Sequence, residues 1–455
     1  MSKSPSNPKG TRDFLPSTLS KRNYILDIIK NNFKLFGFLQ IETPALERNT
    51  TLLGKYGNEG DRLIFKILNS GDKIKKADIT AYKENKLSVF IDSISEKGLR
   101  YDLTVPLARF VSQHQNELVF PFKRFQIQNV WRADRPQHGR FQEFTQCDAD
   151  IIGSNSIIQE IELLKLYDCV FSELGFDDIV FKINHRSLLS ALANYIGVEN
   201  KLNDFISIID KIDKIGVDNA VREIKDSIHN ISTSKLSGLL SEKKISIQKL
   251  DDLFDDSPKT KKGIDDLKTI IEFFSKNNSL KNEIIFDLTL ARGLNYYTGT
   301  IIEVISKSNK KLGSLGGGGR YDDLTSLFNM KMTSGVGISF GLDRIYLQME
   351  EENMFPQHLD ISYDIIVINF GINYIEKLYP LINSLRKNGK KISIYPENIK
   401  LNKQFSYADK HKVKYAILMG ENENLNNEII IKDMINGTQS SHSIIKVNSD
   451  LFEDK

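Results

Sequence analysis

Residues 122–150 read FKRFQIQNVWRADRPQHGRFQEFTQCDAD, and this stretch decides the fold. Strand-forming residues at 122–132 and 140–151 flank a short, polar and cationic loop, Ala133–Gly139. A connection this short joins antiparallel strands. We therefore expect a hairpin within an antiparallel sheet.

Polar side chains alternate along both strands of this hairpin. Because successive side chains point to opposite faces, alternate residues share one face. The residues on that face are Arg124, Gln126, Gln128 and Arg132 on the first strand, and Arg140, Gln142, Gln146, Asp148 and Asp150 on the second. A solvated outer face is one interpretation. The density of Arg, Gln and Asp favours a second, the floor of a polar pocket that binds phosphate and an amine or imidazole.

Two other segments carry unusual polar groups. In Asp287–Thr300, Arg292 stands at an expected strand end and is followed by Tyr296 and Tyr297, which are either packing or binding residues. Gly335–Arg344 places an arginine in the first turn of a helix, where the helix dipole disfavours a cation unless an anion binds nearby.

Glycines gather in an expected loop at Gly313–Gly319. The run Gly316–Gly319 is either a flexible linker or bare backbone that a flat ligand approaches closely. The third glycine of a dinucleotide fingerprint does not follow Gly335 and Gly337, and the chain has no P-loop motif. Any nucleotide must be held in another way.

Periodicity predicts the remaining elements. The expected helices are 20–36, 157–174, 342–349, 374–387 and 402–411. The expected strands are 38–44, 64–67, 89–91, 283–292, 300–305, 336–340, 364–369, 391–395, 415–419 and 428–432. The pattern predicts an α+β body over 1–184 and 281–352, a helical insertion at 185–280, a linker at 353–360, and a small α/β domain at 361–455.

Composition excludes several classes of protein. The 455 residues carry a net charge of +3 and only two cysteines, Cys147 and Cys169, so neither a disulfide framework nor a cysteine-rich zinc site is expected. The polar N-terminus does not resemble a signal peptide, and no apolar run is long enough for a membrane span. We expect a cytoplasmic protein with no membrane partner.

The polar segments together resemble class II aminoacyl-tRNA synthetases. Pro44 resembles motif 1, residues 122–150 resemble motif 2, and Gly335–Arg344 resembles motif 3. The segment Leu290–Gly299 and the stretch Gly316–Tyr321 resemble the histidyl-tRNA synthetase family specifically. The segment KGTRDF at 9–14 and the segment RYDLTVP at 100–106 also resemble this family. The resemblance implies a class II antiparallel-sheet catalytic domain, a helical insertion and a C-terminal anticodon-binding domain.

The resemblance also implies the chemistry, which is histidine–tRNA ligase activity with ATP and Mg²⁺. Arg132 and Arg292 would be catalytic. The histidine-binding residues would be Asp102, Leu103, Thr104, Arg132, Gln146, Asp150, Arg292, Tyr296, Tyr297 and Tyr321. The ATP-binding residues would be Arg132, Arg140, Arg344, Gly317 and Gly318, and no side chain is assigned to a metal.

The resemblance further implies tRNA contacts and a homodimer. Arg135 and Gln137 would meet the acceptor end of histidine tRNA, and the strand ending at Pro44 would form the dimer interface. Nine Lys or Arg residues lie between Arg386 and Lys414, against Glu397 and Asp409. They form either a tRNA-binding surface or an ordinary solvated face.

Two alternatives share the fold. One is the regulatory subunit that serves ATP phosphoribosyltransferase, which usually lacks the catalytic arginines and the anticodon domain. The other is a synthetase-like domain that senses uncharged tRNA, which normally occurs in far longer chains with a kinase. The presence of Arg132, Arg292 and Arg344, and of the region after residue 360, argues against both.

Overall fold

The computed structural model describes residues 5–54, 57–198, 201–228, 231–240, 245–254, 257–277, 279–291, 297–322, 326, 328, 333–360 and 363–452. These residues form two compact units. The first unit contains the residues up to Asp13 together with Tyr24–Met354, and the second contains Phe14–Asn23 together with the residues from Phe355 onward. Among the described residues, no helix has both the length and the apolar character needed to cross a bilayer.

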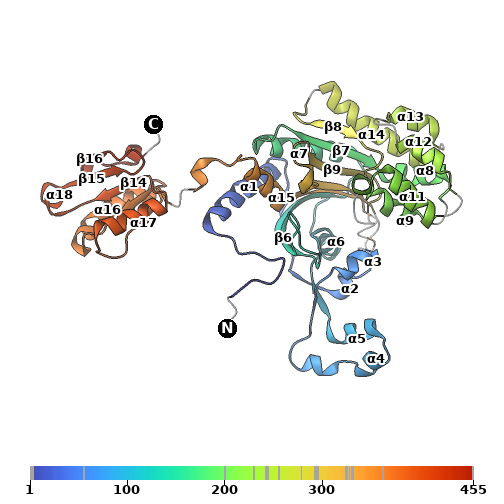
Figure 1. The fold of residues 1–455 in the computed structure, drawn as a ribbon, viewed down its shortest axis with the longest axis horizontal. Helices are drawn as coiled ribbons and strands as arrows, with labels where there is room; N and C mark the ends of the chain where they lie inside the picture. Colours follow the sequence, from blue (N-terminus) through green and yellow to red (C-terminus); the bar gives the residue numbers. More distant parts are fainter. Residues whose placement is uncertain are drawn as a thin grey trace. The chain divides into compact units, whose positions relative to one another are not determined.

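An eight-stranded sheet forms the body of the first unit, in the order β1-β5-β6-β11-β10-β9-β7-β8 (Figure 1). Its strands are β1 (Leu39–Gln40), β5 (Phe122–Trp131), β6 (Glu143–Ile152), β7 (Ile179–His185), β8 (Glu283–Phe286), β9 (Thr300–Ser306), β10 (Gly316–Tyr321) and β11 (Gly335–Gly341). Neighbouring strands run antiparallel, except that β1 is parallel to β5 and β7 is parallel to β8. The predicted hairpin is confirmed as β5 and β6.

The polar face of this hairpin lies inside the protein. Its cross-strand partners are Arg124 and Asp150, Gln126 and Asp148, and Gln128 and Gln146. Arg124, Gln126, Asp148 and Asp150 are all buried. The interpretation as a solvated outer face is therefore wrong, and the alternating polar residues line an interior space.

The opposite face of the sheet is apolar and carries the main core. Helix α1 (Pro16–Leu35) contributes Phe33, whose ring centroid lies 5.2 Å from that of Phe125 and 5.8 Å from that of Phe340. Helix α7 (Ile158–Glu173) adds Phe171 and α15 (Leu342–Glu351) adds Ile345, both fully buried. Burying each such side chain stabilises the fold by about 1.5–3 kcal/mol. The sheet thus presents an apolar face to the core and a polar face to the site.

The predicted insertion is helical, and Figure 1 shows its helices gathered beside β7 and β8. They are α8 (Arg186–Ile196), α9 (Leu202–Ile209), α10 (Ile212–Ile215), α11 (Val217–Ser227), α12 (Thr233–Leu240), α13 (Ile247–Leu253) and α14 (Pro258–Asn277). The first of them begins where β7 ends, at the buried residue His185.

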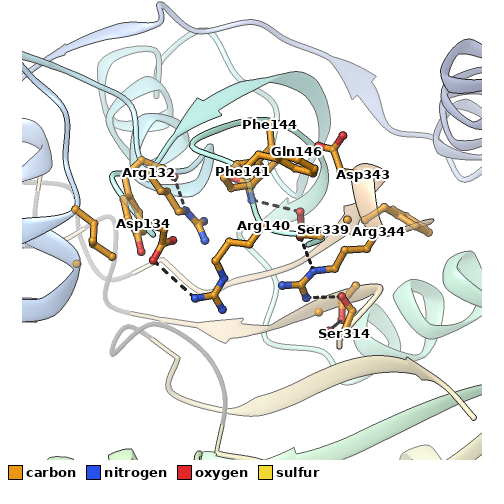
Figure 2. A pocket seen from close by; sticks show the side chains of 18 of the residues that line it. Arg132, Asp134, Arg140, Phe141, Phe144, Gln146, Ser314, Ser339, Asp343 and Arg344 are labelled. Carbon is orange, nitrogen blue, oxygen red and sulfur yellow. Dashed lines mark hydrogen bonds and ion pairs between the residues drawn. The ribbon is translucent and has the colours of Figure 1, made fainter. Parts of the chain in front are cut away.

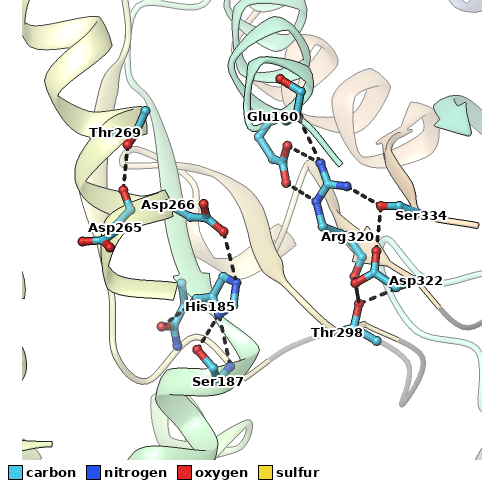
Figure 3. Close-up of polar contacts among 12 residues, drawn as sticks. Glu160, His185, Ser187, Asp265, Asp266, Thr269, Thr298, Arg320, Asp322 and Ser334 are labelled. Carbon is cyan, nitrogen blue, oxygen red and sulfur yellow. Dashed lines mark hydrogen bonds and ion pairs between the residues drawn. The ribbon is translucent and has the colours of Figure 1, made fainter. Parts of the chain in front are cut away.

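His185 caps α8 and is held neutral by burial. Its Nδ1 accepts a hydrogen bond from the backbone N–H of Ser187 at 3.2 Å and faces the Ser187 hydroxyl at 2.7 Å (Figure 3). Burial, together with the nearby charges of Lys262 and Arg320, lowers the pKa of His185 to about 4. The cap therefore depends on an unprotonated imidazole.

This cap predicts an acid-sensitive fold. At pH 7.5 His185 is neutral in both the folded and unfolded states, but between pH 6.5 and 4 only the unfolded state takes up the proton. The free energy of unfolding should fall by about 2 kcal/mol between pH 7.5 and 5 through this group. His185→Asn keeps a capping side chain and removes the titration. Urea unfolding at both pH values should show a smaller fall in the free energy of unfolding, from pH 7.5 to 5, for the variant than for the wild-type protein. An equal fall in both proteins would contradict the assignment.

A smaller part of the first unit surrounds the three-stranded sheet β2-β4-β3. Its strands are β2 (Leu46–Arg48), β3 (Lys66–Ile67) and β4 (Lys97–Leu99). The helices near it in sequence are α2 (Asn49–Leu52), α3 (Gly57–Arg62), α4 (Ile79–Lys83), α5 (Leu87–Ile94) and α6 (Thr104–Gln113). Short 3-10 helices are at Gly71–Lys76 and Lys310–Leu312 in the first unit and at Gln357–Asp360 in the second.

The strand expected at 89–91 is wrong, because these residues belong to the helix α5. A short apolar run does not distinguish a strand from a helix by periodicity. Leu87, Phe90, Ile91 and Ile94 have the spacing of one helical face, and the ring of Phe90 lies 5.1 Å from that of Tyr82 in α4. This contact between neighbouring helices favours the helical form.

Three further expectations need correction. The glycine-rich loop is wrong from Gly316 onward, because Gly316–Tyr321 form the strand β10, paired with both β9 and β11. The strand expected at 283–292 ends at Phe286, because the Asp287 carboxylate accepts from the N–H and hydroxyl of Thr289 and turns the chain. The strand expected at 38–44 is limited to Leu39–Gln40.

The second unit has its own five-stranded sheet, β13-β12-β14-β15-β16. The strands are β12 (Ile365–Val367), β13 (Ile392–Ile394), β14 (Tyr415–Leu418), β15 (Glu428–Asp433) and β16 (Gln439–Ser443). The helices are α16 (Ile372–Lys387), α17 (Leu401–Lys410) and α18 (Glu421–Asn426), with 3-10 turns at Ile444–Lys446 and Ser449–Phe452. Ile382 of α16 packs with one face of the sheet, and Ala408 of α17 packs with the other. The predicted separate α/β domain is confirmed, while the polar strand β16 was not predicted.

Candidate functional site

A small polar cavity lies on the buried polar face of the hairpin. Its volume is about 170 Å³. The residues that line it are Asp102, Thr104, Arg132, Gln146, Asp148, Asp150, Tyr297, Gly317, Tyr321, Gly337, Ile338 and Ser339. Three carboxyl groups and two tyrosines in so small a space suit a ligand with several N–H donors.

A buried ion pair anchors this cavity. Nη2 of Arg124 lies 2.7 Å from Oδ2 of Asp150, and the hydroxyl of Tyr321 donates to Oδ1 of Asp150 at 2.6 Å. Burial raises the pKa of Asp150, while Arg124 and the Tyr321 hydrogen bond oppose that shift. Arg124 is fully buried, so this carboxylate holds a fixed place beside it.

A glycine makes room for that carboxylate. Gly337 lies opposite Asp150 on the neighbouring strand β11, and a Cβ added there would overlap the Asp150 side chain. Glycine lets the carboxylate lie across the strand. Gly337 therefore belongs to the binding site and not to a nucleotide loop, and Gly335 leaves room for the ring of Tyr321.

Asp148 is a site residue to which the sequence interpretation gave no role. It is buried, lines the small cavity and lies between Gln146 and Asp150 on β6. Burial raises its pKa to about 7, Arg124 opposes this, and Asp150 adds to it. The alternation along β6 had already placed Asp148 on the correct face, and that was the signal available.

A larger cavity of about 600 Å³ contains the arginines of the site. Arg132, Arg140 and Arg344 line it, and Figure 2 shows them around one space. Nη1 of Arg344 donates to the carbonyl of Ser314 at 2.8 Å, and Arg140 lies 3.8 Å from Asp134. Three guanidinium groups around one opening suit a polyphosphate.

The two cavities form one continuous site. Arg132, Gln146, Gly317 and Ser339 line both of them. Nε of Arg132 donates to the carbonyl of Tyr101 at 3.0 Å, and its guanidinium lies 4.3 Å from the centre of that ring. Arg132 is thus held at the boundary between the acidic cavity and the arginine-rich cavity.

The insertion contributes to the larger cavity, which the sequence did not suggest. Asn203, Ile206 and Ser207 of α9 and the following Asp210 are among its lining residues. The hairpin strand β6 and helix α9 therefore border the same space, although they are far apart in sequence. No sequence motif marks these residues.

The structure brings together most of the residues expected in the site. Asp102, Thr104, Arg132, Gln146, Asp150, Tyr297 and Tyr321 line the small cavity, and Arg132, Arg140, Arg344 and Gly317 line the larger one. Leu103, Gly318, Arg135 and Gln137 are not among the described residues that line either cavity. Leu103 is fully buried at the start of α6, and Gly318 lies within β10. Arg292 and Tyr296 lie outside the described residues.

A polar network supports the two tyrosines. Arg320, next to Tyr321, forms two 2.6 Å hydrogen bonds to the Glu160 carboxylate (Figure 3). The backbone N–H of Thr298, next to Tyr297, donates to the carbonyl of Arg320 at 2.8 Å. The segments that carry both tyrosines are thus tied to each other and to α7.

Comparisons with known proteins identify the family. The family model described as histidyl-tRNA synthetase matches residues 10–345, and the model described as anticodon binding domain matches residues 364–451. A histidine–tRNA ligase of Christiangramia forsetii is 50% identical over 450 residues, covering 97% of this chain and 98% of that protein. One of Flavobacterium johnsoniae is 48% identical over 468 residues, covering 97% and 98%.

A solved structure agrees with these relatives. The histidyl-tRNA synthetase from Nostoc has a TM-score of 0.80 and 27% sequence identity, covering 96% of each chain. Its likeness extends over both units of the fold, and the family model covers the strands that build the site. The chain belongs to the histidyl-tRNA synthetase family.

Proposed function

We propose that this chain activates L-histidine with ATP to form histidyl-adenylate and pyrophosphate, then transfers histidine to the 3′ end of histidine tRNA. The observation that carries this proposal is the junction of the acidic cavity with the arginine-rich cavity at Arg132. An amino acid in the first cavity and ATP in the second would meet there. The class of reaction therefore follows from the arrangement of the site.

Adenylate formation needs no general base, because the attacking carboxylate is already ionised. One of its oxygens bonds to the α-phosphorus, and the bond from that phosphorus to the pyrophosphate oxygen breaks. Catalysis then consists of positioning and charge stabilisation. Arg132 would hold the α-phosphate and the histidine carboxylate, and the family resemblance assigns Arg292 to the same phosphate. Arg140 and Arg344 would bind the β- and γ-phosphates.

The remaining site residues would divide between the two substrates. Gly317 and Gly318 would provide the flat surface of β10 for ATP. Asp102, Leu103, Thr104 and Gln146 would hold the amino acid backbone, and Asp150, Tyr296, Tyr297 and Tyr321 would recognise its imidazole. A neutral imidazole has one N–H and one acceptor nitrogen, so it needs an acceptor such as Asp150 and a donor such as a tyrosine. An amino acid that lacks these nitrogens would leave buried groups unpaired.

Mg²⁺ fits this site as a partner of the phosphates. The described residues contain no group of three or more metal-binding side chains. Mg²⁺ usually keeps waters and binds through one or two carboxylates plus substrate phosphates. Asp134 lines the larger cavity and would be such a carboxylate. The ion would neutralise charge on the phosphates.

The tRNA would meet both units. Arg135 and Gln137, in the loop between β5 and β6, would contact the acceptor end, and the C-terminal domain would bind the anticodon. Aminoacylation of histidine tRNA by the purified protein tests this function. Histidine-dependent charging supports it, and no charging by a protein that binds ATP and histidine would reject it.

The basic segment of the C-terminal domain yields a separate prediction. Lys400 and Lys403 are exposed at the start of α17, where the helix dipole also favours an anion. The double variant Lys400→Glu with Lys403→Glu should raise KM for tRNA roughly tenfold or more and lower the salt dependence of binding. Pyrophosphate exchange should be unchanged. Lys446→Glu, at an exposed lysine outside the segment, is the control, and equal effects of both variants would contradict the prediction.

We also propose that the protein is a cytoplasmic homodimer. The resemblance of the strand ending at Pro44 to the symmetric interface of the family supports the dimer, and the presence of only two cysteines fits a reducing compartment. Light scattering of the purified protein should show twice the chain mass. A single species of 51.9 kDa in dilute solution would contradict the dimer.

A further inference from the structure

The small cavity has more negative groups than imidazole recognition requires. Asp102, Asp148 and Asp150 all line it, and only Asp150 forms the 2.7 Å ion pair with Arg124. Asp150 and the tyrosines already provide the acceptor and the donor that an imidazole needs. Asp102 and Asp148 therefore add negative charge to the cavity, which a cationic group of the same ligand would balance.

That group is an ammonium, which has three N–H donors and needs three acceptors. Gln146 provides one of them. Its Nε2 lies 3.3 Å from the Ser339 hydroxyl and 3.5 Å from Oδ1 of Asp148, so the amide oxygen is the atom left for a ligand. This oxygen is buried and has no hydrogen-bond partner among the described residues. Asp102 and the Thr104 hydroxyl, which line the same cavity, provide further acceptors, but of these groups only Asp102 is a carboxylate that can balance the charge of the ammonium.

We propose that Asp148 is a second carboxylate that binds the α-ammonium group of the amino acid substrate, which makes it a determinant of substrate specificity. The inference rests on the proposed function and extends it to a residue that the sequence interpretation left without a role. Asp148 is two residues from Gln146 and two from Asp150 on β6, a step of roughly 6.5 Å along a strand. It thus lies between the group assigned to the amino acid backbone and the group assigned to the imidazole.

The electrostatics of the small cavity agree with this position. Burial raises the pKa of Asp148 to about 7, so near neutral pH its carboxyl often carries a proton. The charged groups around it are Arg124 on β5, Asp150 on β6, Asp102 before α6 and Arg132 after β5. An ammonium nearby favours the ionised carboxylate. The ligand cation would therefore take the place of the proton.

The test compares L-histidine with 3-(imidazol-4-yl)propionate, the same molecule without the ammonium group. Each ligand is titrated by calorimetry into the wild-type protein and into the Asp148→Asn and Asp148→Glu variants. Losing a charge-assisted hydrogen bond costs roughly a 10- to 100-fold weakening, so Asp148→Asn should weaken histidine binding by that factor. Binding of the analogue should change little. Asp148→Glu should keep most of the preference for histidine.

Equal weakening of both ligands, or unchanged histidine binding, would overturn the inference. If Asp148→Asn does not fold, a crystal structure of the unchanged enzyme with L-histidine decides. An ammonium nitrogen within roughly 3.2 Å of an Asp148 oxygen supports the inference, and a longer separation rejects it. Failure of the proposed function would give a different result from failure of this inference, because the wild-type protein would then show no histidine-dependent ATP–pyrophosphate exchange.

Discussion

Replacing Asp150 with asparagine is expected to lower the free energy of unfolding by about 3–5 kcal/mol. The change leaves the fully buried Arg124 without its ion-pair partner, which now lies at 2.7 Å. An uncompensated charge in the interior is among the costliest defects that one substitution can introduce. Urea unfolding of the purified variant measures the effect.

A double variant separates stability from activity at this position. Arg124→Met combined with Asp150→Leu replaces the buried pair by apolar groups of similar size, which often restores stability. We expect the double variant to recover most of the lost free energy but not histidine activation, because the imidazole acceptor is still missing. A loss below about 1 kcal/mol in the single variant would show that the pair is not essential.

The second large effect is expected for Arg132→Ala. Loss of one preorganised charge donor should slow histidine-dependent pyrophosphate exchange roughly 100- to 1,000-fold. The side chain lines both cavities and lies over the rings of Tyr101 and Phe144, at 4.3 and 5.1 Å. These contacts hold the guanidinium where the carboxylate and α-phosphate would meet.

A matched control makes this result specific. Arg222 is exposed on α11 in the insertion, and Arg222→Ala removes the same kind of side chain away from both cavities. It should leave exchange unchanged. Near-normal exchange in a folded Arg132→Ala protein would mean that Arg132 does not stabilise the reacting phosphate.

The hairpin shows why much of the site was predictable. Alternation along β5 and β6 fixes which side chains share a face, and the short loop fixes the antiparallel pairing. These local rules were enough to place Gln146, Asp148 and Asp150 together. They did not reveal that the face is buried, because its burial depends in part on β10, which is distant in sequence.

Other features required the folded chain. Gly316–Gly319 look like a loop locally, but hydrogen bonding to β9 and β11 makes them part of a central strand. Helix α5 looked like a strand because Val89, Phe90 and Ile91 form a short, continuous apolar run. The residues of α9 that line the larger cavity carry no local signal, since only tertiary packing brings them there. The composition of a segment does not encode such long-range contacts.

The central claim is that the joined cavities activate histidine and no other amino acid. The most direct measurement is ATP–pyrophosphate exchange by the unchanged protein with each of the twenty amino acids in turn. We expect exchange with histidine, and at most traces with the other nineteen. Exchange that favours another amino acid, or the absence of exchange with histidine from a folded protein that binds ATP, would contradict this account.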